Sequence, residues 1–203
     1  MTAAKTCSKR GRKKNDEDAL DYGISSIPTQ YRGIWYRSRL EAKWAAFFDE
    51  MKWRYQYEPV EFQMWSPDFV LIGATNTFVE VKPITGRHEK VESKLLSSCC
   101  RDEMMVVGLC PKFNLDGEPS LVGWLAEDRS FGDAVFAHDK NEYSKIGFRS
   151  LDMDWTDRIY GGHAKHIACG GVVGGFWANA CNTVQYQKEE WNQQSMQTKG
   201  LNK

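Results

Sequence analysis

The sequence has little of what marks disulfide-bonded, secreted or membrane-spanning proteins. Its 203 residues include six cysteines, and no two of them form a Cys-x-x-Cys pair. That is too few for a disulfide scaffold, and the missing pair argues against a thiol redox motif. The longest apolar stretches, such as residues 104–111, are far shorter than the roughly 20 residues that cross a bilayer.

The first residues also lack the composition of a signal peptide. A basic cluster over residues 9–14 is followed by acidic residues rather than by an apolar segment. With free thiols and no membrane-spanning run, we expect a cytoplasmic protein that does not associate with membranes.

An excess of charge of one sign is absent as well. The chain carries 27 basic and 27 acidic residues, so its net charge is zero. A protein that coats nucleic acid is usually basic overall. Any binding to a polyanion must therefore come from a local basic patch, or from an acidic metal site beside a basic groove.

The hydrophobic patterning predicts an α/β fold, in which helices flank a mixed central β-sheet. Apolar residues at helical spacing follow the capping-box sequence Ser38-Arg-Leu-Glu41 and predict a helix over 38–52. The spacing predicts a second helix over 89–100. Alternating or continuous apolar runs predict strands over 53–64, 69–72, 77–82, 104–109 and 121–125.

Composition divides the chain into four parts. We expect a mobile charged tail over 1–24, a core over 25–125, a C-terminal elaboration packed on that core over 126–190, and a polar tail over 191–203. Within the elaboration we expect loops up to residue 175, and then a helix over 176–190 that packs through Trp177 and Val184.

Two carboxylates are predicted to meet across a hairpin. Asp68 and Glu80 each lie six residues from Ala74, the centre of the predicted turn, so a regular register makes them cross-strand neighbours. Two like charges in that arrangement are unfavourable unless a cation lies between them. Period-two alternation also places Lys82 on the face of Glu80. Oxygen ligands of this kind suit Mg²⁺, for which Mn²⁺ is a plausible substitute.

These groups could hydrolyse a phosphodiester bond. A bound Mg²⁺ lowers the pKa of a coordinated water and neutralises charge on the phosphate. Lys82 could orient or help deprotonate the attacking water. A simpler interpretation of the same residues is a surface Glu-x-Lys ladder on a hairpin.

The motif resembles that of a known nuclease superfamily. Ser66-Pro-Asp-Phe69, followed by Glu80-Val-Lys82, is similar to the Pro-Asp…(Asp/Glu)-x-Lys motif of restriction-endonuclease-like nucleases. The segment Tyr36-Arg-Ser-Arg-Leu-Glu41 and the helix after it resemble those of phage Holliday-junction-resolving endonucleases. The resemblance covers residues 31–110.

The resemblance implies a restriction-endonuclease-like core and a Mg²⁺-dependent endonuclease that cuts DNA, with selectivity for branched or distorted duplexes. It implies that Asp68 and Glu80 are metal ligands and that the Val81 carbonyl completes the coordination shell of the metal. It also implies that Glu41 is the helix acid that reaches the metal, and that Lys82 is catalytic. It also implies a phage-encoded protein acting in the host cell. Symmetric cutting of a junction would require a homodimer.

Basic residues surround these positions in the sequence and are candidate phosphate contacts. The candidates for binding nucleic acid are Arg32, Arg37, Arg39, Lys43, Arg87, Lys90 and Lys94. Taken singly, each of them could equally be a solvated residue on a helix or loop surface.

A cluster of histidines and cysteines lies near the C-terminus. His163, His166, Cys169 and Cys181 could in principle form a structural Zn²⁺ site. Their spacing is irregular and the segment is rich in glycine, so we favour ordinary loop histidines over zinc.

Three alternatives to a DNA endonuclease remain at this point. The chain could be a nuclease for linear DNA ends or RNA, a catalytically silent nucleic-acid-binding protein, or a zinc-stabilised interaction module. The presence of Asp68, Glu80 and Lys82 together argues against a silent protein, because a degenerate site would be expected to lose one of them.

Overall fold

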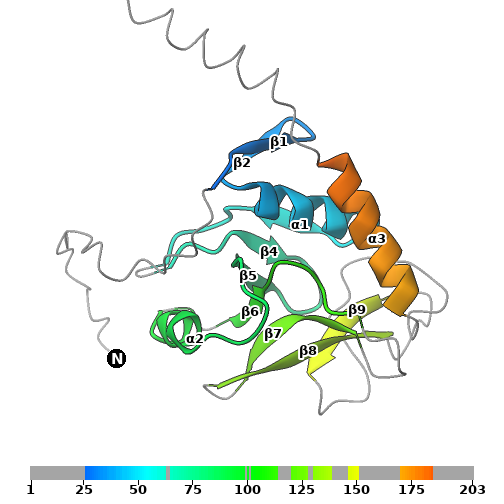
Figure 1. Cartoon of the computed structure of the whole chain (residues 1–203). Coiled ribbons are helices and arrows are strands. Elements are labelled where there is room, and N and C mark those ends of the chain that lie inside the picture. Colours follow the sequence, from blue (N-terminus) through cyan, green and yellow to red (C-terminus); the bar gives the residue numbers. More distant parts are fainter. Residues whose placement is uncertain are drawn as a thin grey trace, which may run out of the picture.

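A mixed β-sheet forms the centre of the computed structural model (Figure 1). The structure describes residues 26–62, 65–98, 100, 102–113, 120–127, 130–138, 146–150 and 170–184. Within these residues the sheet has seven strands in the order β3-β4-β5-β6-β7-β8-β9. The strands are β3 Tyr55–Tyr57, β4 Phe69–Leu71, β5 Thr77–Val81, β6 Glu103–Val107, β7 Leu121–Glu127, β8 Ser130–His138 and β9 Ile146–Ser150.

One pair of neighbouring strands, β5 and β6, is parallel, and the other neighbours in the described sheet are antiparallel. A parallel pair needs a crossover connection, and helix α2 (Glu89–Leu96) supplies it. Helices α1 (Arg39–Glu50) and α3 (Gly170–Thr183) lie on the opposite side of the sheet from α2 (Figure 1). The predicted α/β fold with a mixed central sheet and flanking helices is confirmed.

A small hairpin packs beside α1. It consists of β1 (Thr29–Tyr31) and β2 (Ile34–Tyr36). Its two turn residues, Arg32 and Gly33, both have positive φ angles of 49° and 79°. Such angles are typical of the tight hairpin turns that match the twist of the flanking strands. The hairpin leads directly into Arg37 and the start of α1.

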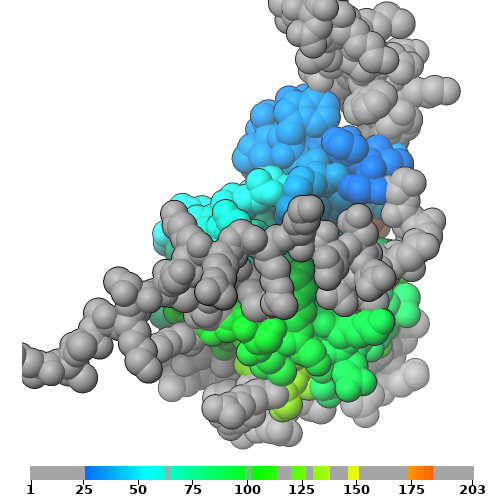
Figure 2. Space-filling view, turned by 90° about the vertical axis from the view of Figure 1, so that its left-hand side faces the viewer, coloured from blue at the N-terminus to red at the C-terminus, as the bar shows by residue number. Residues whose placement is uncertain are grey.

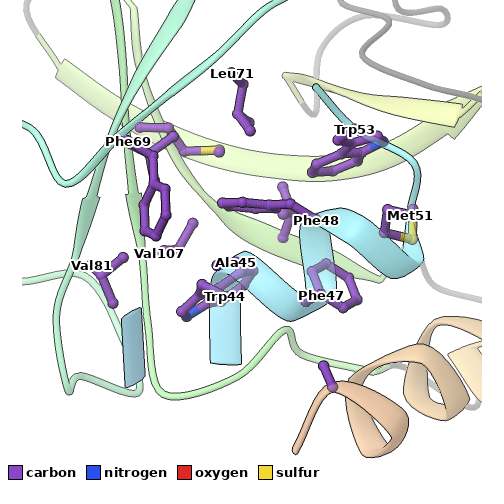
Figure 3. Packing of buried hydrophobic residues seen from close by; sticks show 14 of the residues in the cluster. Trp44, Ala45, Phe47, Phe48, Met51, Trp53, Phe69, Leu71, Val81 and Val107 are labelled. Atoms are coloured by element: carbon purple, nitrogen blue, oxygen red, sulfur yellow. The ribbon is translucent and has the colours of Figure 1, made fainter. Parts of the chain in front are cut away.

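Helix α1 forms because a cap precedes an apolar stripe, as the sequence predicts. The Ser38 hydroxyl accepts the backbone N–H of Glu41 at 3.1 Å and caps the first turn. Trp44, Phe47 and Phe48 are fully buried. Phe48 lies over the strands, edge-on to Phe69 with 5.4 Å between ring centroids (Figure 3).

Alternation along the central strands divides the core between the two faces of the sheet. Val79 and Val81 belong to the cluster under α1, whereas Phe78 packs against the cluster that α2 closes. The face of Phe78 is therefore also the face of Glu80, as the period-two pattern predicts.

Six of the elements predicted up to residue 125 are shorter in the structure, among them the following three. The strand predicted over 53–64 is reduced to Tyr55–Tyr57, the helix predicted over 89–100 ends at Leu96, and the strand predicted over 69–72 ends at Leu71. Glu58, directly after β3, has a φ of 45°, which takes the backbone out of the extended conformation.

The prediction of loops after residue 125 is wrong for two segments. β8 and β9 extend the sheet beyond β7. The sequence of β8 does not alternate visibly, because Val135, Phe136 and Ala137 are buried on both faces of the strand. A strand covered on both sides loses the period-two signal.

Residues 170–175, the last part of a glycine-rich segment expected to be a loop, form the start of α3. Four of the six residues at positions 170–175 are glycine, which disfavours a helix by about 1 kcal/mol per residue relative to alanine. Packing overrides this preference: Val173 and Ala180 are fully buried, and Trp177 lies 4.9 Å from Trp44 of α1 between ring centroids. The predicted packing through Trp177 and Val184 is confirmed, but the helix begins six residues earlier than predicted and ends at Thr183 rather than at residue 190.

Among the helices of the described residues, none is both long enough and apolar enough to cross a membrane.

Candidate metal centre

The hairpin of β4 and β5 sets the two predicted acids opposite each other. Phe69 pairs with Val79, and Val70 with Phe78. The same register, continued by one pair, places Asp68 across from Glu80. Each of the two residues is only 4% exposed. The predicted juxtaposition therefore puts two carboxylates together in a buried position, where like charges are unfavourable without a cation.

Asp68 binds two donors from different elements. Its Oδ1 accepts a hydrogen bond from Nη2 of Arg37 at 2.5 Å, and its Oδ2 accepts one from the backbone N–H of Val81 at 2.7 Å. Burial and the negative charge of Glu80 raise the pKa of Asp68 to about 7, against the opposing charge of Lys82. This carboxyl group is thus held near the point of ionisation at neutral pH.

Glu80 is fixed by one cation and one neutral donor. Its Oε1 lies 2.5 Å from Nζ of Lys82, and its Oε2 accepts the indole N–H of Trp65 at 2.6 Å. Trp65 is itself buried and stacks on Phe62 with 5.7 Å between centroids. The indole can only donate, so it is suited to fixing a carboxylate oxygen.

Glu41 reaches the same region from the first turn of α1. Its Oε1 accepts the Ser38 hydroxyl at 2.8 Å, while its Oε2 accepts the Tyr57 hydroxyl at 2.6 Å and the backbone N–H of Arg37 at 3.2 Å. Burial and the bond to Glu41 raise the pKa of Tyr57, so its hydroxyl stays protonated and donates. Glu41 does not reach back to the Ser38 backbone as a full capping box requires. Glu41 is 8% exposed, and its negative charge lies close enough to Asp68 to raise the pKa of that group.

The residues present fit a hard divalent cation by chemistry, because three buried carboxylates supply the oxygen ligands that Mg²⁺ takes. Within the described part of the chain, however, no three acids, histidines or cysteines are arranged as a metal-binding group. Asp68 and Glu80 each contact a basic side chain instead. Val81 contacts Asp68 through its N–H; the predicted role of its carbonyl as a ligand stays a prediction.

Of the predicted phosphate contacts, Arg37 alone is bonded to the acids in the contacts that the structure records. Arg32 pairs with Asp49 at 3.2 Å near the other end of α1, and Lys43 lies beside Cys181 of α3. Arg39 is half-buried in the first turn of α1. The side chains of Arg32 and Lys43 are therefore not brought to Asp68 and Glu80.

Arg87 lies two residues before α2, Lys90 and Lys94 lie within it, and all three are exposed. Arg87 forms two hydrogen bonds to Glu92, of 2.9 and 2.8 Å. Figure 2 shows the face of the molecule on which α2 lies, with the N-terminal hairpin in blue above and the segment around α2 in green below.

Most of the predicted zinc cluster lies outside the described residues. This holds for His163, His166 and Cys169, whereas Cys181 lies half-buried in α3. Burial raises the pKa of the Cys181 thiol, against the effect of the nearby Lys43.

The sequence analysis missed two contacts of the candidate acids. Trp65 was assigned no role, and Arg37 was treated only as a phosphate contact. The position of Trp65 just before the Pro-Asp motif could have suggested that it lies near the acids. The bond of Arg37 to Asp68 joins residues 31 positions apart and has no local signal.

Comparison with known proteins gives no assignment: no protein-family model matches the chain, and neither a curated protein nor a solved structure matches it.

Proposed function

We propose that the chain is a metal-dependent nuclease that hydrolyses phosphodiester bonds in DNA. The observation that carries this proposal is the pair of buried acids, Asp68 and Glu80, in direct cross-strand register. Proteins rarely bury two facing carboxylates without a function for their charge. Lys82 and Glu41 at the same place complete the set of groups that the resemblance to restriction-endonuclease-like nucleases leads one to expect.

Asp68 and Glu80 would hold the ion, with Glu41 contributing directly or through a water. Mg²⁺, or Mn²⁺ in its place, supplies a water of lowered pKa and neutralises charge on the phosphate when bound. The protein's own part is to hold these carboxylates in place. The Val81 N–H does so for Asp68, and the Trp65 indole does so for Glu80.

Lys82 is the proposed group that orients the attacking water as an ammonium or, once it has lost its proton, helps to deprotonate that water. Its side chain is 26% exposed, whereas its partner Glu80 is buried. It therefore lies at the boundary between the buried acids and solvent, where a phosphate and a water can reach it. An ammonium on a flexible stem can contact both.

DNA is the proposed partner, since Arg37 at the site and the exposed basic residues of α2 offer phosphate contacts. The resemblance to junction-resolving enzymes makes branched or distorted duplexes the first substrates to test, and a homodimer the arrangement that would cut both strands. A cytoplasmic location in the host of a phage would fit such an enzyme.

The experiment compares two aspartates that each pair with an arginine. Asp68→Asn keeps the size of the side chain and one acceptor oxygen, so we expect it to fold but to lose Mg²⁺-dependent cleavage. Asp49→Asn changes a similar pair near the far end of α1 and should still cleave. Lys82→Ala should bind metal but lose about 10²-fold or more in rate. The substrates are linear, nicked, four-way and single-stranded DNA, and RNA.

Cleavage by Asp68→Asn at the wild-type rate would contradict the proposal. Activity on RNA or on linear ends alone would keep the chemistry and replace the substrate.

A further inference from the structure

The guanidinium of Arg37 joins three acids that come from different parts of the chain. Its Nη2 lies 2.5 Å from Oδ1 of Asp68, and its Nε lies 2.9 Å from Oε1 of Glu58 and 3.9 Å from Oε2 of Glu41. Two of these three acids, Asp68 and Glu41, are assigned to the metal in the proposed function. The arginine therefore takes up carboxylate oxygens that a metal would use.

When no metal is bound, another cation is needed at this point. Asp68 and Glu41 are buried, and Glu80 adds a third buried carboxylate next to Asp68. An uncompensated buried charge is strongly destabilising. Partial burial lowers the pKa of Arg37, but the charges of Asp68 and Glu41 outweigh this effect and raise it overall. Arg37 thus stays charged and offsets part of this repulsion.

Hydrogen bonds fix the backbone of Arg37, whereas its side chain is exposed to solvent. Its backbone N–H donates to the Tyr57 hydroxyl at 3.0 Å and to Glu41. Its side chain, by contrast, is 54% exposed, although Asp68 is almost completely buried. The side chain can therefore rotate outward while the main chain stays in place.

We propose that Arg37 is the resident cation of this site: a divalent ion must displace its guanidinium from Asp68, and the released guanidinium then binds a backbone phosphate of the nucleic acid. The inference rests on the proposed function and deepens it. A guanidinium binds phosphate through two parallel hydrogen bonds, so the exchange replaces one good partner by another.

The exchange makes metal and DNA cooperate. A phosphate that takes up Arg37 removes the competitor of the metal for Asp68, so DNA tightens metal binding. By reciprocity, metal tightens DNA binding by the same factor. A site of this kind is loaded with metal chiefly when the substrate is present.

The first test measures Mn²⁺ binding to the metal-free protein by calorimetry, without any substrate. Arg37→Ala removes the competitor and should bind Mn²⁺ about tenfold more tightly than the wild type. Arg32→Ala is the matched control, because it removes a guanidinium paired with Asp49, away from the buried acids. Its Mn²⁺ affinity should be unchanged.

The second test uses the wild-type chain and does not depend on the folding of a variant. In ¹⁵N-labelled protein the Nε–Hε resonance of Arg37 should shift as Mg²⁺ is added, with the same midpoint as binding, while that of Arg32 stays in place. The shift reports release of the guanidinium from its carboxylate partners.

The third test measures DNA binding in Ca²⁺ and in EDTA. Ca²⁺ should increase the DNA affinity of both proteins. The factor of increase should be at least about five times larger for the wild type than for Arg37→Ala. An equal gain would overturn the cooperativity.

The outcomes separate the two proposals. If the wild type binds Mn²⁺ but Arg37→Ala binds it equally or less tightly, or if the Arg37 resonance does not respond, the role of Arg37 is refuted and the nuclease proposal survives. If neither protein binds Mn²⁺, both proposals are refuted.

Discussion

Two tryptophans show how the same group can serve either the core or the site. Trp53 and Trp65 are each 3% exposed, and each donates its indole N–H to one oxygen. The acceptor of Trp53 is the backbone carbonyl of Ile146, at 2.7 Å, whereas that of Trp65 is the Glu80 carboxylate. One bond supports the packing of the core, and the other orients a proposed metal ligand.

This contrast leads to a prediction about Trp65. Trp65→Phe keeps an aromatic ring beside Phe62 and Phe78 but removes the donor to Glu80. Partners of metal ligands typically contribute about 10–100-fold to metal affinity, so we expect Mn²⁺ binding to weaken by about tenfold. Trp53→Phe is the control: it should lose stability to a similar extent and keep its Mn²⁺ affinity. Calorimetry and thermal denaturation measure the two effects, and equal Mn²⁺ affinities would limit Trp65 to a packing role.

At the scale of elements, the start of α1 combines a structural cap with a candidate catalytic acid. The Ser38 hydroxyl accepts the Glu41 N–H and donates to the Glu41 carboxylate. The sequence left two roles open for Glu41, capping or metal binding. In the structure the Glu41 carboxylate accepts the Ser38 and Tyr57 hydroxyls rather than the Ser38 backbone N–H, and it lies close enough to Asp68 to raise the pKa of that group. Its capping bond is therefore not made, and its role at the metal stays a prediction.

Two substitutions in α1 distinguish the roles. Glu41→Gln keeps the size and one acceptor oxygen and removes the charge, so we expect a folded protein that cleaves poorly. Ser38→Ala removes the cap, costing about 1 kcal/mol of stability, and leaves every acid in place. Its cleavage should remain above that of Glu41→Gln. Chemical denaturation and single-turnover cleavage measure the two effects, and normal cleavage by Glu41→Gln would leave the site with Asp68, Glu80 and Lys82.

The elements differ in how far the sequence could predict them. The register of Asp68 with Glu80 was predictable, because a short hairpin fixes pairing through the turn and the alternation of the strands. β8 and the start of α3 were not, because burial on both faces hides alternation and because packing overrides the low helix propensity of glycine. The partners of Asp68 were not predictable for a different reason. Arg37 is distant from it in sequence, and nothing in a local pattern indicates which acid an arginine will meet.

For the molecule as a whole, the buried acids predict how stability depends on pH when metal is absent. Burial and the charge of Glu80 raise the pKa of Asp68 from 3.8 to about 7. The folded protein therefore binds this proton more tightly than the unfolded chain does. The resulting stabilisation is complete below pH 4 and is lost as the pH rises through about 7.

Denaturation in guanidinium chloride at a series of pH values checks this prediction. The difference in unfolding free energy between the wild type and Asp68→Asn should fall from pH 4 to pH 7.5 in EDTA. Mg²⁺ should raise the stability of the wild type at pH 7.5, because an ion that binds the folded state alone stabilises it. A difference that does not vary with pH would show that Asp68 titrates alike in both states.

The indole of Trp53 also bears on how the chain reaches its fold. Trp53 precedes β3, at one edge of the sheet, and its acceptor Ile146 belongs to β9, at the other edge, 93 residues away. Trp44 makes a similar bond to the Gly108 carbonyl across 64 residues. Closing such long loops lowers the entropy of the chain before the contacts that offset this loss have formed. A topology with distant contacts of this kind therefore folds slowly. On the ribosome, α1 and all the proposed metal ligands would be synthesised well before β9, and the core around Trp53 could close only after β9 had emerged.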